Sequence, residues 1–300
     1  MKKNLLSLFA LVGLMGVAFV GCDDDDDDNG QSTPVGTASY VGEGTEALQV
    51  AGAADYTFSY DENGVLTAIT GSGSTTYTIT SNPYTITKTD KWGDKEVCSD
   101  FRFNEQGYIT SLKFAEQYTD EETNLTAEVE VDNISFGYNA DGQMSSVYVT
   151  SEYFGDVESY NSATVNITLT YKDGDLISIS KQSKESGTEI DWDGELKKTS
   201  YTEEYTETTE VVTSDKENKY RQLVANVVGL PLFKIFGPLG WYGKGTAHYI
   251  SRSESKMVTT KTVDGVSKEE TEEDIDSYTV KVNDDGFVTE FNGYSIEYAK

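Results

Sequence analysis

The sequence predicts an all-β protein, built as one antiparallel sheet whose strands run up and down in chain order. Three observations predict it. A unit that has the pattern of a β-hairpin recurs along the chain, its turns close on glycine, and the runs between turns are rich in threonine, tyrosine and branched residues. The unit is clear at residues 58–69, where alternate aromatic residues lead into a polar loop, a glycine and a second apolar run.

Copies of this hairpin occupy residues 101–112, 136–147 and 280–291, and a relative with a shorter loop occupies residues 169–179. An Asp or Asn that opens the loop can accept hydrogen bonds from the backbone two residues on. The closing glycine takes a positive φ, which a Cβ would strain. After each glycine, an apolar-x-x-apolar spacing breaks the strand period, so either a bulge follows the turn or both strand faces are covered. The predicted turn glycines are Gly64, Gly107, Gly142, Gly174 and Gly286.

The first residues have the pattern of a targeting segment. Lys2 and Lys3 precede an apolar run over residues 5–20, and a small residue then precedes Cys22. This order is typical of a bacterial lipoprotein signal, although Phe19 stands where leucine is usual. Signal cleavage would leave Cys22 as the first residue, with lipid on its thiol and amine. We therefore expect a signal peptide over residues 1–21 and a lipid anchor at Cys22.

An acidic run directly follows this cysteine: Asp23, Asp24, Asp25, Asp26, Asp27 and Asp28. Like charges in a row repel one another, which predicts a disordered tether over residues 22–39, ahead of one β domain over residues 40–300. The run resembles the export tag of Bacteroidetes-type surface lipoproteins. That resemblance implies the outer face of the outer membrane, with its lipid as the partner of Cys22. In enterobacterial sorting an Asp at this position would instead retain the protein at the inner membrane, so the predicted localisation depends on the host.

The charge of the chain limits the classes of partner that are expected, and its cysteine content limits the disulfides. The chain has 52 acidic and 23 basic residues and a net charge of -29. Nucleic acid and bare anionic lipid are therefore excluded as partners, since both need Lys/Arg surfaces. The two cysteines are Cys22 and Cys98, and lipidation uses the first, so no internal disulfide is expected. Cys98 lies in a strand-like run, which predicts a buried small apolar side chain.

The second half departs from the simple pattern. Residues 198–213 alternate Tyr and Glu with Thr and Glu, so this strand should border solvent or line a water-filled interior. Earlier, residues 125–131 and 134–138 alternate in opposite phase, which predicts a bulge near Asp132. Residues 220–229 predict a short helix, and an apolar Gly/Pro-broken loop follows to residue 244. This loop either plugs the end of the β core, covers a ligand cavity or contacts a partner.

No catalytic group is evident in the sequence. His248 is the single histidine, carboxylate pairs are expected by chance in so acidic a chain, and neither zinc spacing nor a phosphate loop is present. Residues 191–194 match half a calcium loop but lack its remaining acids, so a turn is favoured. We expect no enzyme, no metal and no cofactor. Aromatic residues are the candidate ligand contacts, because sugars stack on such rings: Trp92, Trp192, Trp241 and Tyr242.

The tandem Tyr-x-x-x-Gly hairpins, the apolar stretch over residues 230–244 and the lipoprotein start together resemble a Bacteroidetes lipoprotein family, domain of unknown function 4595. Its porin-like fold implies a large meander that curls into a barrel or half-barrel over residues 40–300. The family has no assigned activity or catalytic residues. We expect a non-catalytic surface lipoprotein that displays loops to a glycan or protein. The alternative is a carrier of a lipophilic small molecule within the curled sheet, and a glycan hydrolase is the third possibility.

Overall fold

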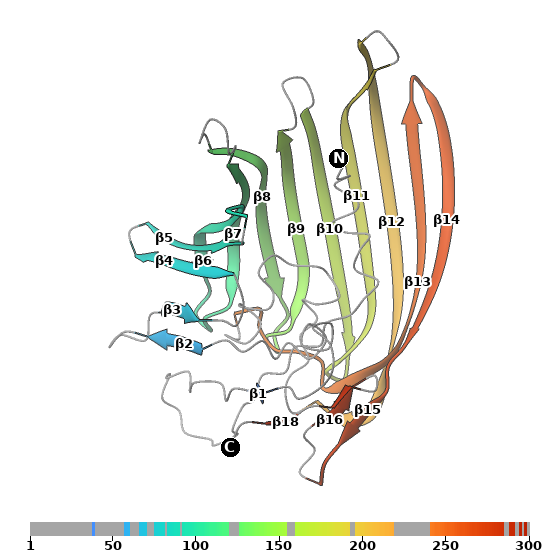
Figure 1. Ribbon diagram of the computed structural model, residues 1–300. Coiled ribbons are helices and arrows are strands. Elements are labelled where there is room, and N and C mark those ends of the chain that lie inside the picture. The colour runs from blue at the N-terminus through green and yellow to red at the C-terminus, as the bar shows by residue number, and fades with distance from the viewer. Residues whose placement is uncertain are drawn as a thin grey trace.

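The main body of the molecule is one 11-stranded antiparallel sheet in the order β14-β13-β12-β11-β10-β9-β8-β7-β6-β5-β4. The computed structural model describes residues 38–39, 57–60, 66–70, 75–81, 83–90, 92–119, 126–154, 160–192, 196–218, 241–284, 288–291, 294–295 and 297–298. Strands adjacent in sequence are adjacent in this sheet, which confirms the predicted up-and-down meander. Figure 1 shows the sheet curled into an open half-barrel that does not close.

The strands lengthen along the chain, from 6 residues in β4 to 22 in β12. The sheet consists of β4 (Thr76–Ser81), β5 (Tyr84–Thr89), β6 (Lys95–Phe103), β7 (Ile109–Thr119), β8 (Thr126–Tyr138), β9 (Met144–Phe154), β10 (Tyr160–Lys172), β11 (Asp175–Trp192), β12 (Leu196–Glu217), β13 (His248–Val263) and β14 (Val266–Ser277). Smaller sheets pair β2 (Thr57–Tyr60) with β3 (Leu66–Thr70), β1 (Ala38–Ser39) with β18 (Glu297–Tyr298), and β15 (Val280–Val282) with β16 (Val288–Phe291) and β17 (Tyr294–Ser295).

The turn between β6 and β7 shows why the hairpin unit folds as it does. Oδ1 of Asn104 accepts hydrogen bonds from the backbone N–H groups of Gln106 and Tyr108, at 3.0 and 2.9 Å. Gly107 closes the loop with a φ of +79°, a conformation that favours glycine. The same arrangement recurs where an Asx residue opens the loop and a glycine of positive φ closes it, at Asn139 with Gly142 and at Asp90 with Gly93.

Shorter two-residue turns join two other strand pairs. Asp173 and Gly174, between β10 and β11, have φ values of +54° and +86°. Two positive φ values in succession are those of a type I′ turn, whose twist matches the flanking strands. Asp264 and Gly265 form the same turn between β13 and β14. Two predicted turn glycines, Gly64 and Gly286, lie outside the described residues, and the strands on either side of each pair antiparallel.

A bulge follows the turn on the second strand of the hairpins predicted from the sequence, whereas β5–β6 and β13–β14 pair regularly after their turns. Between β6 and β7, Arg102 pairs with Ser111 and Phe103 with Ile109, which leaves Thr110 as the extra residue. Ile109 and Leu112 are therefore both buried, at 0% and 3% exposure. Of the two explanations for the apolar-x-x-apolar spacing, the bulge is the one that the structure has. The equivalent extra residues are Thr67, Ser145, Ile177 and Thr289.

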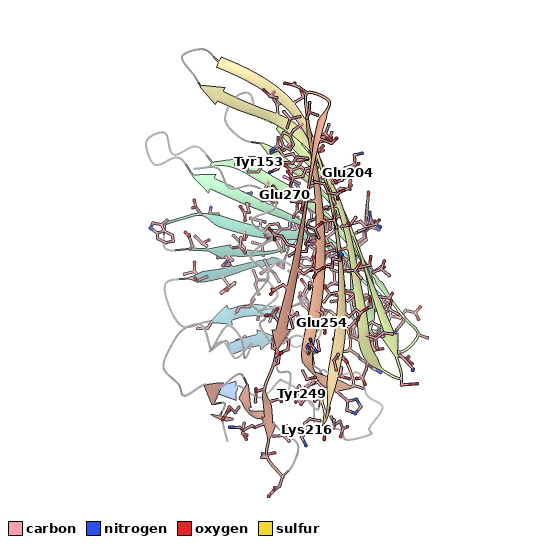
Figure 2. All side chains as sticks on the ribbon, turned by 90° about the vertical axis from the view of Figure 1, so that its right-hand side faces the viewer. Tyr153, Glu204, Lys216, Tyr249, Glu254 and Glu270 are labelled. Carbon is pink, nitrogen blue, oxygen red and sulfur yellow. The ribbon has the colours of Figure 1, made fainter. Side chains whose placement is uncertain are left out.

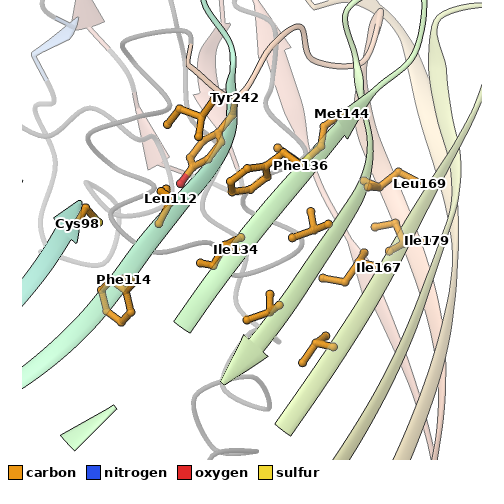
Figure 3. Packing of buried hydrophobic residues seen from close by; sticks show 14 of the residues in the cluster. Cys98, Leu112, Phe114, Ile134, Phe136, Met144, Ile167, Leu169, Ile179 and Tyr242 are labelled. Atoms are coloured by element: carbon orange, nitrogen blue, oxygen red, sulfur yellow. The ribbon is translucent and has the colours of Figure 1, made fainter. Parts of the chain in front are cut away.

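The core lies on one face of the sheet, which we call the inner face. It is marked by Ile134, Val149, Val165 and Ile179, each at most 5% exposed. Figure 3 shows core side chains on the same side of neighbouring strands. Burial of these aliphatic and aromatic groups is the main stabilising force of the sheet.

The opposite face and the later strands are polar. Figure 2 shows Glu204, Glu254 and Glu270 on the long strands β12, β13 and β14, and all three side chains are exposed. The solvent border expected for residues 198–213 holds for one face of β12. The other face is covered, since Tyr201 and Tyr205 are each only 9% exposed.

The bulge predicted near Asp132 is wrong in position. Asp132 pairs regularly with Ser151 on β9, and the irregularity lies earlier, where Val129 is the extra residue opposite β7. The alternation of apolar residues gave the wrong position for the bulge because the inner face of β8 has two acidic residues, Glu130 and Asp132, at 5% and 6% exposure. The inner face is thus apolar toward the turns named above and polar farther along the strands.

The predicted helix over residues 220–229 and the apolar loop up to residue 240 fall outside the described residues. The end of that loop, residues 241–244, is described and has turn and bridge geometry. Across the described part of the chain, no helix has the length and apolar character needed to cross a membrane.

Candidate functional site

Residues 241–247, which we call the strap, cross the ends of three hairpins. The backbone carbonyl of Trp241 accepts a hydrogen bond from the N–H of Ile109 at 2.8 Å. The N–H of Lys244 donates to the carbonyl of Gly142 at 2.9 Å, and the N–H of Ala247 donates to that of Gly174 at 3.0 Å. The strap therefore ties together the turns β6–β7, β8–β9 and β10–β11, and the first of these bonds fixes Trp241 beside β7.

Side chains and a close backbone approach hold the strap in place. Nε2 of Gln143 donates to the carbonyls of Gly174 and Gly245 at 2.7 and 3.0 Å. Gly243 has a φ of +80°, and a Cβ there would lie 2.6 Å from the carbonyl oxygen of Gly142. Only glycine allows that approach without movement of the backbone. The hydroxyl of Tyr138 donates to the carbonyl of Ile109 at 2.8 Å and also lies 3.5 Å from the carbonyl oxygen of Trp241 in the strap.

A second bulge, in β6, positions the residues opposite Trp241. Ser99 pairs with Lys113 and the next pair is Arg102 with Ser111, so Asp100 and Phe101 both lie opposite one residue of β7. Asp100 has a φ of +55°, a region that Asp and Asn enter more readily than other side-chain-bearing residues. A bulge of this kind redirects the side chains that follow it.

The bulge and the strap meet at an open cleft of about 410 Å³, which we call the aromatic cleft. Its size is in the range of small-molecule sites, about 300–1,000 Å³. Rings dominate its walls, and Phe103 is 43% exposed. The residues that line it are Leu66, Pro83, Tyr84, Asp100, Phe101, Phe103 and Trp241.

The rings meet mostly edge to face. The centroid of Trp241 lies 5.2 Å from that of Phe103 and 5.9 Å from that of Phe101, with interplanar angles of 78° and 69°. Phe101 and Phe103 are nearly parallel, at 13° and 6.2 Å. Tyr84 meets Phe101 at 68° and 5.7 Å. These are favourable aromatic geometries, so the walls hold their shape without a ligand.

The electrostatic character of the cleft comes from one residue. Asp100 is the single charged residue among the described residues of the lining, its side chain is exposed, and no described Lys or Arg forms an ion pair with it. None of the lining residues that the structure describes is cationic. An apolar, π-rich hollow with one carboxylate can stack flat or methyl-rich groups and accept a hydrogen bond or a positive charge.

The aromatic residues singled out in the sequence have four different positions. Trp241 lines the cleft. Tyr242 is 1% exposed and packs against Phe136 at 5.6 Å, so it belongs to the core and has no face for a ligand. Trp92 is in the turn between β5 and β6 and is 70% exposed. Trp192 ends β11, and its side chain lies outside the described part, as do Cys22 and the six aspartates after it.

His248 pairs with Asp175 at the base of β13. Its Nδ1 lies 2.9 Å from Oδ2 of Asp175, and its backbone N–H donates to Oδ1 at 2.8 Å. Burial alone would raise the pKa of Asp175, but hydrogen bonds from His248 and Thr246 outweigh it and hold the pKa below its usual value. This carboxylate joins the strap to the start of β11, a structural task.

Cys98 is fully buried, as the sequence predicts. Burial, with a smaller contribution from the charge of Glu96, raises the pKa of its thiol well above the usual value. A neutral, inaccessible thiol is a poor nucleophile. Within the described residues, no group of three or more His, Cys, Asp and Glu side chains has an arrangement that could hold a metal ion.

Sequence reasoning missed most of the cleft. Phe101 and Phe103 were assigned only to the lead strand of a hairpin, and Tyr84 and Asp100 were not singled out. One signal was present, because an Asp inside a strand-like run is unfavourable for a regular strand and suited to a left-handed bulge position. Nothing local in the sequence shows that Trp241 would reach Phe103.

Comparisons with known proteins find similarity among solved structures. No protein-family model matches the chain, and no curated protein matches its sequence. Among solved structures, it is similar to a porin-like protein from Bacteroides vulgatus, with 11% identity and a TM-score of 0.36 over 82% of this chain and 97% of that one. A porin-like protein from Bacteroides uniformis has 12% identity and a TM-score of 0.21, over 72% of this chain and 90% of that one. The resemblance to domain of unknown function 4595 stays a prediction.

Proposed function

We propose that the protein is a non-catalytic binding scaffold and that the aromatic cleft holds its ligand. The observation that carries this is the cleft itself, a hollow of about 410 Å³ walled by Tyr84, Phe101, Phe103 and Trp241 and built from a β-bulge and the strap. Binding sites combine apolar walls with a few placed polar groups, and rigid secondary structure holds both. Asp100 is the placed polar group here.

The ligand is a glycan or a protein presented to the cell surface, where the protein is held by lipid on Cys22. The support for the anchor is the signal-like order of residues 1–21 and the acidic tether over residues 22–39, ahead of the β domain over residues 40–300. Two acyl chains on the first residue suffice for stable membrane attachment. Replacing Cys22 by serine then abolishes incorporation of radiolabelled palmitate, and continued labelling of that variant would refute the anchor.

The carrier alternative differs in the kind of cavity that it needs. A carrier of a lipophilic molecule encloses its cargo in an apolar cavity, whereas the aromatic cleft is open and has an exposed ring, Phe103, on its wall. The openness favours display over carriage. Lipid that co-purifies with the protein in stoichiometric amount, measured by mass spectrometry, would instead support the carrier.

The decisive experiment is a binding screen of the mature lipoprotein on arrays of glycans and surface proteins. We compare the wild type with Trp241→Ala and with Trp92→Ala, a matched control because Trp92 is exposed but does not line the cleft. We expect Trp241→Ala to weaken binding roughly tenfold, the size of losing a well-packed aromatic contact, and Trp92→Ala to leave it unchanged. Circular dichroism checks that each variant is folded.

Two results would contradict the proposal. Equal loss of binding in both tryptophan variants would place the ligand outside the cleft. Turnover of a glycan by the wild type would show an enzyme, and the candidate acids would then have to be sought elsewhere, since the described residues of the cleft lining include a single carboxylate.

A further inference from the structure

We propose that the aromatic cleft selects a methylated ammonium group, as found in choline, with ring faces around the methyl groups and Asp100 facing the charge. This inference rests on the proposed function, and it names the group that a glycan or protein ligand would place in the cleft. It is carried by three properties of the lining: the arrangement of the rings, the sign of the charge and the scarcity of hydrogen-bonding groups.

The rings provide π faces that look in different directions. Trp241 stands at 78° to Phe103 and at 69° to Phe101, and Tyr84 stands at 68° to Phe101. Rings set nearly at right angles enclose a corner, so a round group placed there meets more than one face. A cation within about 6 Å of a ring centroid is attracted by the ring quadrupole, most strongly by that of Trp. The neighbouring centroids here are 5.2–5.9 Å apart, so these rings contact one another, and a cation would meet the ring faces that line the cleft.

The charge of the lining selects a cation over an anion. Among the described lining residues, Asp100 contributes the single charge and none is basic. The whole chain adds a net charge of -29, which raises the local concentration of cations and repels anions. A ligand that carries a phosphate or carboxylate next to its ammonium group is therefore disfavoured relative to choline itself.

The few hydrogen-bonding groups select a cation without N–H donors. Of the lining residues that the structure describes, only Asp100, Tyr84 and Trp241 have polar atoms in their side chains, and the Tyr84 hydroxyl already donates to the carbonyl of Leu66 at 3.5 Å. A primary ammonium or a sugar rich in hydroxyls would lose water without enough replacement partners, and each polar group left unpaired weakens binding. A quaternary ammonium has no N–H to satisfy and presents methyl groups to the rings.

The experiment is isothermal titration calorimetry of the mature lipoprotein in a polyoxyethylene detergent, which contains neither sugar nor ammonium. The probes are choline chloride, its uncharged isostere 3,3-dimethyl-1-butanol, and glycerophosphocholine as the form found in a lipid headgroup. We expect choline to bind roughly tenfold more tightly than the isostere, within the range of cation–π and charge contributions. Glycerophosphocholine should bind more weakly than choline. If it binds more tightly, the preference for a cation that lacks a neighbouring anion is refuted.

Asp100→Asn is the sharp variant, because Asn tolerates the left-handed conformation that the bulge requires, so the fold is kept. It should weaken choline binding roughly tenfold and leave the isostere unchanged. Trp241→Ala should weaken the binding of both choline and the isostere, and Trp92→Ala should leave the binding of both unchanged.

The outcomes separate this inference from the proposed function. Equal affinity for choline and the isostere, with both lost in Trp241→Ala, refutes cation selection but keeps the cleft as a binding site. A glycan or protein that binds through Trp241 while choline does not bind also refutes this inference alone. Absence of binding by every probe, glycan and protein refutes both.

Discussion

The polar part of the inner face makes stability depend on pH, and Asp132 is the residue that tests this. Its side chain is 6% exposed and its Oδ1 has no hydrogen-bond partner. Burial raises the pKa of Asp132 from 3.8 to about 6, the charge of Glu116 adds to this rise, and Ser151 opposes it in part. The perturbation that we choose is Asp132→Asn, which keeps the shape and removes the charge.

The magnitude follows from the displacement of the pKa. Between 3.8 and about 6 lie roughly two pKa units, and each unit corresponds to about 1.36 kcal/mol. The folded state holds the proton more tightly than the unfolded state. The free energy of unfolding therefore falls as the pH rises from about 4 to about 6, and the full cost, about 3 kcal/mol, is present above that window. The buried amide of Asn costs about 1 kcal/mol, so Asp132→Asn should gain about 2 kcal/mol at pH 7.

The assay is urea denaturation followed by far-ultraviolet circular dichroism, at pH 4, 5.5 and 7, for wild type and variant. The many exposed carboxylates contribute to both proteins alike, so the difference between the two isolates Asp132. We expect the variant to be more stable at pH 7 and to lose that advantage as the pH falls to 4. A difference that is constant with pH, or a variant that is less stable at pH 7, would refute the reasoning.

Three further predictions concern the strap. Gly243→Ala should lower the free energy of unfolding by on the order of 3 kcal/mol, because the new Cβ clashes with the backbone and also strains the left-handed conformation. Gly107→Ala is the control, since Gly107 has a φ of +79° but open space for a Cβ, and it should lower the free energy of unfolding by only about 1–2 kcal/mol. Equal losses in urea titrations would show that the clash at residue 243 is relieved. Tyr138→Phe removes the hydrogen bond to Ile109 and should cost about 1 kcal/mol by the same measurement; an unchanged midpoint would contradict it. Asp175→Asn should change stability in the opposite direction to Asp132→Asn, because the pKa of Asp175 is lowered in the folded protein. The variant should be less stable than the wild type by about 1 kcal/mol at pH 7, and this difference should disappear as the pH falls through the usual range of an Asp. A variant that is more stable at pH 7 would contradict the prediction.

The hairpins could be predicted because their cause is local. Asn104 and Gly107 belong to one four-residue loop, and the side-chain hydrogen bonds and positive φ that form the turn involve no distant residue. The same signals were present but not recognised at Asp90 with Gly93 and at Asp264 with Gly265. Asp-Gly between branched residues is among the strongest hairpin signals in a sequence, so the turn at Asp264 and Gly265 has a local cause as well.

The inner face of β8 was harder to predict because its acids contradict the usual pattern. A strand with one buried face is recognised by apolar residues at alternate positions. Glu130 and Asp132 occupy buried positions, which shifts the apparent phase and places the expected bulge three positions away from Val129. Buried carboxylates of this kind are costly, and their cost is visible only once burial is known.

The cleft could not be predicted because it depends on contacts between distant segments. Trp241 reaches Phe103 only through the strap, whose hydrogen bonds join turns far apart in the sequence. The sequence identified Trp241 as a candidate and gave Tyr242 equal weight. Their difference is one of orientation, since Tyr242 points into the core beside Phe136 while Trp241 lines the cleft.

The open half-barrel also gives the acidic composition a structural reason. An unclosed sheet has edge strands, and among the described strands β14 pairs with β13 alone, so within that part of the chain one side of its 12 residues has unpaired backbone groups. Such an edge invites pairing with a second molecule. Nearly every residue of β14 is exposed and half of them are acidic, namely Glu269, Glu270, Glu272, Glu273, Asp274 and Asp276. Two such edges brought together would oppose like charges at strand spacing, so the composition lets a sheet that does not close remain separate from its copies.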